Sequence, residues 1–441
     1  MGTSVLHIKT EVECRVYLFD EEKGIAKPGT YFNLEVRKGE QDLLFVSTEN
    51  EGVICLKSYN VEEDDCNYRM TLEQSQFINV STPATEEEIS SGVEDEFGVI
   101  YSHDGLQLLS VWNDMFIEYH IQDGCKVIRG CAFSECINLT AITLPASLTH
   151  IGNRAFSFCN LTTVTLPASL THVGDGAFSG TGIRNVVSHS PNFTFIDGCL
   201  IDQLDHKLLA YLSDNNIVSL PADLTHIGYE AFYGCDNLTA IFLPNSLTHI
   251  GYSAFSECSN LTTITLPDRL THIDGNAFKG CQKLTAITLP TGLTHIEDST
   301  FWGCQNLTAI TLPAGLIHIG DRAFEGCAKL SAITLPDSLT HVGNQSFSYC
   351  RSLTQITLPV GLTHIGNGAF CGCDNITAIN LPANLTHIGE NAFLWCFNLS
   401  HIYISEGMWS HFKELLPKEL HGKLTVINNS GSVETLIKDN N

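Results

Sequence analysis

The chain of 441 residues has no long apolar run. Its opening segment, MGTSVLHIKTEVECRVYLFD, has no stretch that could form the core of a signal peptide, and no later window reaches the length of a membrane span. Position 6 is Leu6, where the pattern for a lipid on Gly2 requires Ser or Thr, so no membrane association is expected. We therefore expect a cytoplasmic protein. A cell-surface or secreted location is the alternative, if a removed signal peptide preceded Met1.

Basic residues are also scarce. Lys and Arg number 23 against 49 Asp and Glu, and residues 1–120 alone hold 24 acidic residues against 8 basic ones. Binding to phosphate backbones or anionic lipid works by neutralising charge with Lys and Arg. The composition therefore argues against nucleic acid as a partner.

Catalytic motifs are missing as well. The chain contains no phosphate-binding loop, no GxSxG elbow and no HExxH pair. Its charged and polar residues change from repeat to repeat and converge at no identifiable position. No enzyme activity and no cofactor are expected.

Cysteine is plentiful, but no CxxC pair with metal-binding spacing occurs among the 17 cysteines. Ten of them occupy one column of a repeat: Cys136, Cys159, Cys235, Cys258, Cys281, Cys304, Cys327, Cys350, Cys373 and Cys396. A free cysteine behaves as a small buried hydrophobic residue. The column is therefore interpreted as reduced thiols in a packing position, with no metal bound.

The repeat itself dominates the chain. The motif LTAITLPxxLTHIGxxAFxxCxN recurs with its first apolar residue at Leu238, Leu261, Leu284, Leu307, Leu330, Leu353, Ile376 and Leu399, a period of 23 residues. A strict period in this range marks a solenoid, in which stacked units share one continuous core.

Each repeat has an inside and an outside. The run from Leu284 to Leu289 predicts a strand whose outward positions are Ala286 and Thr288, and a following Pro ends it. Phe301 and Cys304 are expected to complete the buried layer.

These residues resemble the BspA-type class of leucine-rich repeats, known from bacterial and protist proteins, whose consensus LxxIxIPxxLxxIGxxAFxxC is matched closely from Ile121 to Leu399. The resemblance implies a right-handed leucine-rich repeat solenoid of parallel β-strands with few helices, a role in adhesion or protein binding, and no enzymatic activity. The first 75 residues are similar, more weakly, to the small β domains that precede such arrays in gut Bacteroidetes proteins.

Composition and patterning suggest how the chain is divided. The expected parts are a small β domain at 1–75, an acidic linker at 76–97, the solenoid at 98–425 and a flexible tail at 426–441. Within the solenoid we expect a hairpin-like N-terminal cap, an insertion near 184–219 and a capping helix near 408–420, where apolar residues recur at helical spacing.

One column is unusual in carrying histidine in every regular repeat: His150, His172, His226, His249, His272, His295, His318, His341, His364 and His387. The row is interpreted as a solvated position multiplied by duplication. A metal-binding or pH-sensing stripe is the alternative, because imidazole ligates metals and titrates near neutral pH.

Residues that break the pattern are the best candidates for binding. Phe242, Gln355, Asn380, His401 and Tyr403 fall on the outward face of the first strand, whereas Tyr233, Trp302, Tyr349 and Trp395 fall in the loops after the repeat Phe. Exposed aromatic residues are enriched in binding patches.

The sequence thus predicts a noncatalytic protein-binding scaffold that uses the solenoid surface, with a protein ligand of unknown identity. A cell-surface adhesin and a structural self-assembly module are the alternatives. A monomer is expected, with self-association as the other possibility.

Overall fold

The computed structural model describes residues 4–18, 21–50, 52–61, 67–74, 77–112, 115–427 and 433–434. The chain divides into two compact units, Met1–Leu200 and Ile201–Asn441. The division falls within the segment near 184–219, where the repeat motif lapses.

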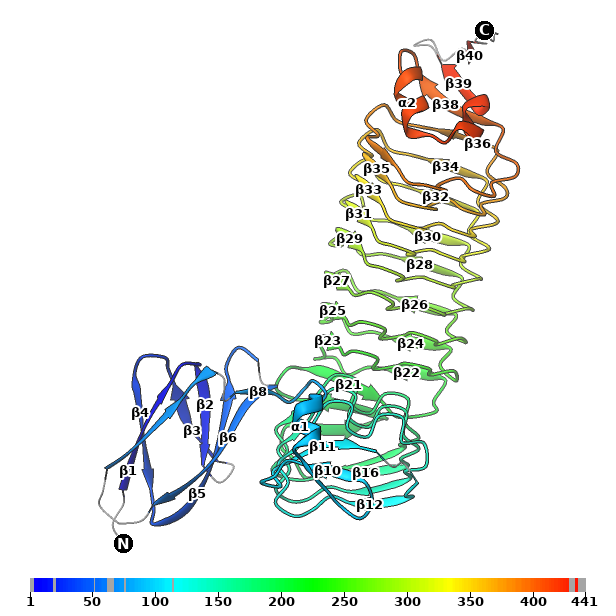
Figure 1. The fold of residues 1–441 in the computed structure, drawn as a ribbon. Coiled ribbons are helices and arrows are strands. Elements are labelled where there is room, and N and C mark those ends of the chain that lie inside the picture. Colours follow the sequence, from blue (N-terminus) through cyan, green and yellow to red (C-terminus); the bar gives the residue numbers. More distant parts are fainter. Residues whose placement is uncertain are drawn as a thin grey trace. The chain divides into compact units, whose positions relative to one another are not determined.

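The first unit begins with a small β region (Figure 1). Its strands are β1 (Ser4–Thr10), β2 (Cys14–Leu18), β3 (Glu21–Ala26), β4 (Tyr31–Val36), β5 (Gly39–Ser47), β6 (Val53–Val61), β7 (Asn67–Leu72) and β8 (Ile78–Asn79). They form two sheets, ordered β4-β1-β7 and β3-β2-β5-β6-β8, which are antiparallel except for the β1–β7 pair. Leu6 and Ile8 of one sheet share a buried cluster with Val16 and Phe45 of the other, so the alternating apolar residues face each other between the sheets.

The described residues 77–97, which lie in the predicted acidic linker, contain regular secondary structure. They contain β8, the helix α1 (Glu86–Ser90) and β9 (Val93–Glu94). The helix is fixed by a capping box, in which Thr85 and Glu88 each accept a hydrogen bond from the other's backbone N–H. Glu86, Glu87 and Glu88 lie in the first turn of this helix, where carboxylates are favoured.

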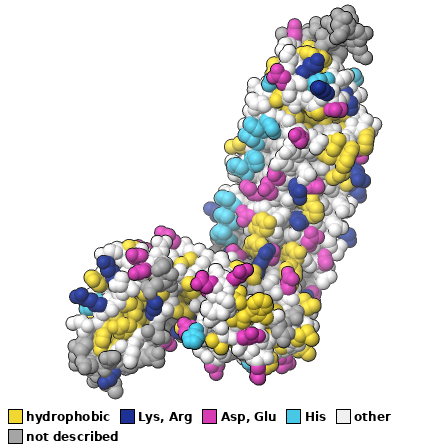
Figure 2. All heavy atoms as spheres, in the orientation of Figure 1, with side chains coloured by type: hydrophobic (Ala, Val, Ile, Leu, Met, Phe, Trp, Pro, Cys, Tyr) yellow, Lys and Arg dark blue, Asp and Glu magenta, His cyan; other side chains and the backbone are white. Residues whose placement is uncertain are grey.

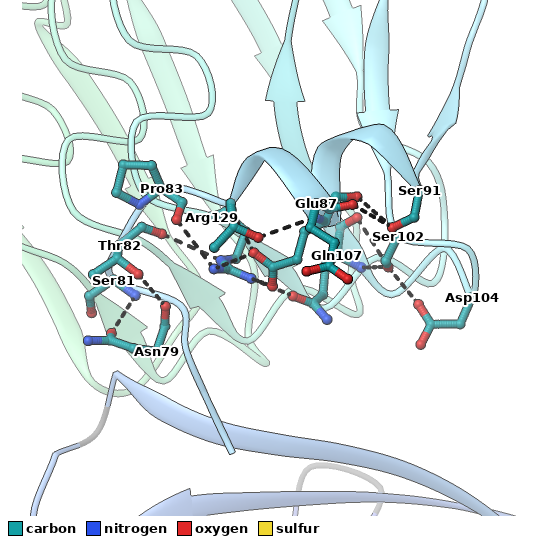
Figure 3. Close-up of polar contacts among 12 residues, drawn as sticks. Asn79, Ser81, Thr82, Pro83, Glu87, Ser91, Ser102, Asp104, Gln107 and Arg129 are labelled. Carbon is teal, nitrogen blue, oxygen red and sulfur yellow. Dashed lines mark hydrogen bonds and ion pairs between the residues drawn. The ribbon is translucent and has the colours of Figure 1, made fainter. Parts of the chain in front are cut away.

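Arg129 ties this segment to the first layer of the solenoid (Figure 3). Its side chain, only 4% exposed, donates to Glu88 Oε1 at 2.8 Å, to Gln107 Oε1 at 3.3 Å and to the Thr82 carbonyl at 3.4 Å. Burial alone would raise the pKa of Glu88, but hydrogen bonds from Arg129 and the Thr85 backbone outweigh it and lower that pKa.

The array within the first unit starts with an antiparallel hairpin, β10 (Val99–Tyr101) and β11 (Gln107–Val111). The strands that follow are β12 (Glu118–His120), β13 (Val127–Ile128), β14 (Ala141–Thr143), β15 (His150–Ile151), β16 (Thr163–Leu166), β17 (His172–Val173), β18 (Asn185–Ser188) and β19 (Phe193–Ile196). From β11 onward the pairs β11–β13, β13–β15 and β15–β17 are parallel, as are β12–β14 and β16–β18.

The second unit contains the remaining repeats, whose strands stack as successive rungs (Figure 1). After β20 (Cys199–Asp202), which spans the division, and β21 (Lys207–Tyr211), each repeat supplies a strand of about three residues and a strand of two. The longer strands are β22 (Ile217–Ser219), β24 (Ala240–Phe242), β26 (Thr263–Thr265), β28 (Ala286–Thr288), β30 (Ala309–Thr311), β32 (Ala332–Thr334), β34 (Gln355–Thr357), β36 (Ala378–Asn380) and β38 (His401–Ser405). The shorter ones are β23 (His226–Ile227), β25 (His249–Ile250), β27 (His272–Ile273), β29 (His295–Ile296), β31 (His318–Ile319), β33 (His341–Val342), β35 (His364–Ile365) and β37 (His387–Ile388).

These strands pair in parallel with their equivalents one repeat away, for example Ile287 with Ile310 and Ile319 with Val342. The parallel-strand solenoid expected from the 23-residue period is therefore confirmed.

The core is a stack of aromatic rings. Phe301 is fully buried and lies between Phe278 and Phe324, with ring centroids 5.6 Å and 5.4 Å away and interplanar angles of 3° and 7°. The other column members from Phe255 to Phe393 stack in the same way. Every layer thus adds one ring to a continuous apolar column, as the sequence predicted for Phe301.

The cysteine column lies beside the rings. All ten cysteines are buried except Cys235, which is half-buried. The thiol of Cys304 donates to the carbonyl of Phe278 at 3.2 Å, and the same contact links Cys258 with Phe232 at 3.0 Å. Burial raises the pKa of the Cys304 thiol to about 12. The column therefore packs as neutral thiols, and at least eight of the ten donate to a backbone carbonyl inside the core.

The C-terminal end carries the helix α2 (Trp409–Leu415), a 3₁₀ helix (Lys418–Lys423), β39 (Leu424–Ile427) and β40 (Val433–Glu434). Phe412 is the buried residue of α2. Most of the tail expected at 426–441, namely 428–432 and 435–441, lies outside the described residues. Within the described ranges no helix combines the length and apolar character that crossing a membrane requires.

Candidate binding faces

The longer strands of the second unit present a face of small side chains. In β26, β28, β30, β32 and β34 the central residue is buried and its two neighbours are exposed. The outward residues are mostly Ala and Thr, as in Ala286 and Thr288, because a period of two sends alternate side chains to opposite faces. Departures from Ala and Thr are therefore the only large features on this face within the described strands.

Four of the five predicted face residues lie on consecutive long strands. Gln355 begins β34, Asn380 ends β36, and His401 and Tyr403 lie on β38. Asn380 pairs in register with Tyr403, and the rings of His401 and Tyr403 stack at 5.7 Å with an interplanar angle of 6°. We refer to these four residues as the face cluster.

Phe242 does not join them. It is 63% exposed on β24, five long strands before β34, which at strand spacing corresponds to roughly 24 Å.

The predicted loop aromatics separate into two kinds. Tyr233 and Trp302 are half-buried, and the ammonium of Lys279 lies 4.7 Å from the ring centroid of Trp302. Tyr349 and Trp395, by contrast, are exposed and lie close together, with ring centroids 6.4 Å apart.

Tyr349 and Trp395 occupy a column that requires a left-handed backbone. Its members Gly280, Gly303 and Gly326 have φ near 71–73°, whereas Tyr349 has φ 57° and Trp395 has φ 60°. A residue with a side chain costs about 1–2 kcal/mol more than glycine in this conformation. The two aromatic residues therefore occupy positions where the backbone favours glycine.

Gly372, the column member between them, lets the two rings approach. A Cβ at this position would lie 2.8 Å from Cδ1 of Tyr349, so the tyrosine ring covers the bare backbone of the next repeat. A groove of about 480 Å³ opens beside the pair. Its lining consists of Asn344, Gln345, Ser348, Tyr349, Asn367, Gly368, Cys371, Glu390, Asn391, Leu394 and Trp395. A smaller hollow of about 160 Å³ is also lined by Tyr349 and Trp395, together with Arg351, Asp374 and Phe397.

The histidine row lies along one edge of the second unit (Figure 2). Its shortest ring-centroid separations are 4.3 Å between His249 and His272, 4.4 Å between His341 and His364, and 4.5 Å between His226 and His249. In several repeats the preceding threonine holds the ring: Thr248 Oγ1 donates to the Thr225 carbonyl at 3.1 Å and lies 2.8 Å from Nδ1 of His249. The Thr248 hydroxyl has a single hydrogen, which it donates to the Thr225 carbonyl. It therefore accepts a hydrogen bond from Nδ1–H of His249, and Nε2 of the neutral ring keeps its lone pair.

Charge is disfavoured on three histidines of the row, His226, His249 and His364. Burial, followed by the neighbouring imidazoles, lowers the pKa of both His249 and His364. For His226 the causes are burial and then Lys207. In the part of the chain that the structure describes, no group of three or more His, Cys, Asp or Glu side chains could hold a metal ion.

Sequence reasoning missed the polar half of the groove. Asn344, Asn367 and Glu390 line it, but each varies within a loop and none stands out by residue type. The interrupted glycine column was the available signal, because Tyr349 and Trp395 replace glycine at a fixed place in the repeat.

Comparisons with known proteins agree with this architecture. The family described as "BspA type Leucine rich repeat region" matches residues 112–204, 202–331 and 294–414, in six copies. No curated protein gave a significant match.

Three solved structures are similar. A leucine-rich repeat protein from Eubacterium ventriosum has 20% identity and a TM-score of 0.50, with 64% of this chain and 92% of that one covered. A leucine-rich repeat protein from Bacteroides ovatus has 23% identity and a TM-score of 0.42, with 76% and 97% covered. A leucine rich cell surface protein from Faecalibacterium prausnitzii has 21% identity and a TM-score of 0.41, with 85% and 95% covered.

The first of these supports the fold, and the family match spans more than half of the chain. The chain therefore belongs to the proteins with a BspA-type leucine-rich repeat region.

Proposed function

We propose that the protein is a noncatalytic scaffold that binds another protein through its long-strand face, with the face cluster as the contact that carries affinity. The observation behind the proposal is the position of Gln355, Asn380, His401 and Tyr403 on three consecutive long strands. They form a polar and aromatic patch at one end of a face that otherwise carries small residues.

The chemistry of the cluster suits a protein interface. Tyrosine buries a large area and still offers a hydroxyl, and it is enriched among residues that dominate binding energy. Small Ala and Thr side chains on the preceding strands leave the backbone of a partner free to approach closely. The cluster carries no Lys or Arg, so a partner would be held by hydrogen bonds and ring contacts and not by phosphate recognition.

The test uses substitutions that restore the residues common in each column. A double variant, Gln355→Ala with Tyr403→Thr, removes two of the four residues of the face cluster, and Phe242→Thr removes an exposed aromatic residue elsewhere on the same face. Proteins captured from a native lysate by the unmodified chain should be lost with the double variant and kept with Phe242→Thr. Equal capture by all three would refute the assignment.

Light scattering over a concentration series separates this proposal from self-assembly. A mass that stays at 48.4 kDa supports a monomeric binder, and a mass that rises with concentration supports the assembly module. Protease treatment of intact cells, with the chain followed by antibody, distinguishes a cytoplasmic scaffold from a surface adhesin.

A further inference from the structure

We propose that the groove beside Tyr349 and Trp395 binds a neutral saccharide whose pyranose rings pack against these two aromatic side chains. This site is separate from the proposed protein-binding face, because its residues come from the loops after the repeat Phe and not from the long strands.

The first argument is the placement of the rings. Two repeats separate Tyr349 from Trp395, a spacing of about 10 Å at strand spacing, yet their centroids are 6.4 Å apart. The rings lean toward each other over Gly372, where no side chain intervenes. They therefore form a tilted aromatic platform, 38° from parallel, that is accessible from solvent.

The second argument is that the backbone does not favour these residues. The same column holds glycine at Gly280, Gly303 and Gly326, although Phe158 and Glu257 also take its positive φ, a conformation that disfavours residues with a side chain. Strained positions that persist in a regular framework are a sign of function. Neither ring adds to the buried Phe stack, so packing does not account for them.

The third argument is the set of hydrogen-bonding groups beside the platform. Gln345 Oε1 accepts from Arg322 Nε at 2.9 Å, and Asn367 Oδ1 accepts from the backbone N–H of Glu390 at 2.8 Å. Both donors are unambiguous, so each amide has its oxygen committed and its NH₂ group left as a donor. The exposed carboxylate of Glu390 supplies an acceptor at the same groove.

A saccharide matches this combination. Each hydroxyl both donates and accepts, and so can bridge the amide NH₂ groups and the carboxylate. The carbon-bound hydrogens of a pyranose form an apolar face that suits the negative face of an aromatic ring. An anionic sugar fits poorly, because Glu390 and Asp374 border the site and the chain carries a net charge of −26.

The test is affinity electrophoresis in gels cast with a neutral glucan, mannan, galactan or xylan, with heparin as an anionic control. Retardation of the native chain by at least one neutral polymer is expected, and none by heparin. Calorimetry with the corresponding tetrasaccharide should then show binding that is at least tenfold weaker for Trp395→Gly.

Trp395→Gly removes the ring and places glycine, the residue suited to the positive φ of this column, at position 395. Its melting temperature should be no lower than that of the native chain. The matched control is Glu257→Gly, in the same column but outside the groove, where the carboxylate covers Gly280 as Tyr349 covers Gly372. This control should bind the sugar as the native chain does.

A second variant addresses the polar side. Gln345→Glu keeps the oxygen that accepts from Arg322 and removes the amide donor, so binding should again weaken by several fold. The proposal is overturned if none of the four neutral polymers retards the chain. It is also overturned if Trp395→Gly binds normally, or if Glu257→Gly loses binding equally. A peptide that binds at Tyr349 and Trp395 in place of sugar would count against it as well.

Discussion

Replacing Phe301 by alanine should remove one ring from the aromatic column. Phe301 has no exposed surface, and both of its faces are covered by the neighbouring rings of Phe278 and Phe324. A buried Phe→Ala change costs about 3–5 kcal/mol, and the cost is highest where the surroundings cannot close over the cavity. Both neighbouring rings are fixed in their own layers, so we expect about 4–5 kcal/mol here.

The damage should remain local. Repeats interact chiefly with their nearest neighbours, so the layers of Phe278 and Phe324 should lose stability first. Native-state hydrogen exchange measures this directly, because each amide reports the free energy of its own opening. Amides in β26, β28 and β30 should exchange faster, whereas those in β1–β7 should keep the protection of the native chain.

Phe397→Ala is the control, since this ring is 77% exposed and its loss should change stability by no more than about 0.5 kcal/mol. Unchanged protection in the layers on either side of Phe301 would refute the stacked-ring account of the core. Equal loss of protection in β1–β7 would refute its local coupling.

Further predictions address the thiols, the histidine row and the N-terminal junction. Thiol reagents should leave Cys281 and Cys304 unmodified until the chain is denatured, because both are buried and burial raises the pKa of their thiols. Rapid labelling of the native chain would show that the cysteine column faces solvent. The folded pKa values of His249 and His364 are lowered, so the folded chain binds fewer protons and stability should fall as pH drops below the unfolded pKa of about 6.5. Melting temperatures from pH 7.5 to 5.5 should therefore decline less when both are changed to Gln, and parallel curves would show that the row carries no electrostatic load. Arg129→Ala should cost about 1–3 kcal/mol because it leaves the partly exposed Glu88 carboxylate without its partner; if α1 kept its exchange protection, this ion pair would not hold the junction.

Much of the fold follows from periodicity alone. The 23-residue repeat fixes which side chains recur in register, and the alternation within L-x-x-I-x-L separates Ile287, which is buried, from Ala286 and Thr288, which are exposed. The same periodicity predicted that Phe301 and Cys304 are buried, because an apolar residue that recurs in every repeat is expected to form the shared core.

Other features depend on side chains from different layers and required the tertiary structure. The approach of Tyr349 to Trp395 depends on ring torsions and on the space over Gly372. The NH₂ groups of Gln345 and Asn367 remain available as donors because each amide oxygen accepts a hydrogen bond from a neighbouring layer. The tautomer of His249 is set by the carbonyl that accepts the hydrogen bond of the Thr248 hydroxyl. A linear pattern specifies the column to which a residue belongs. Only the packed structure decides which atoms of neighbouring columns meet, because those contacts join residues 23 or 46 positions apart.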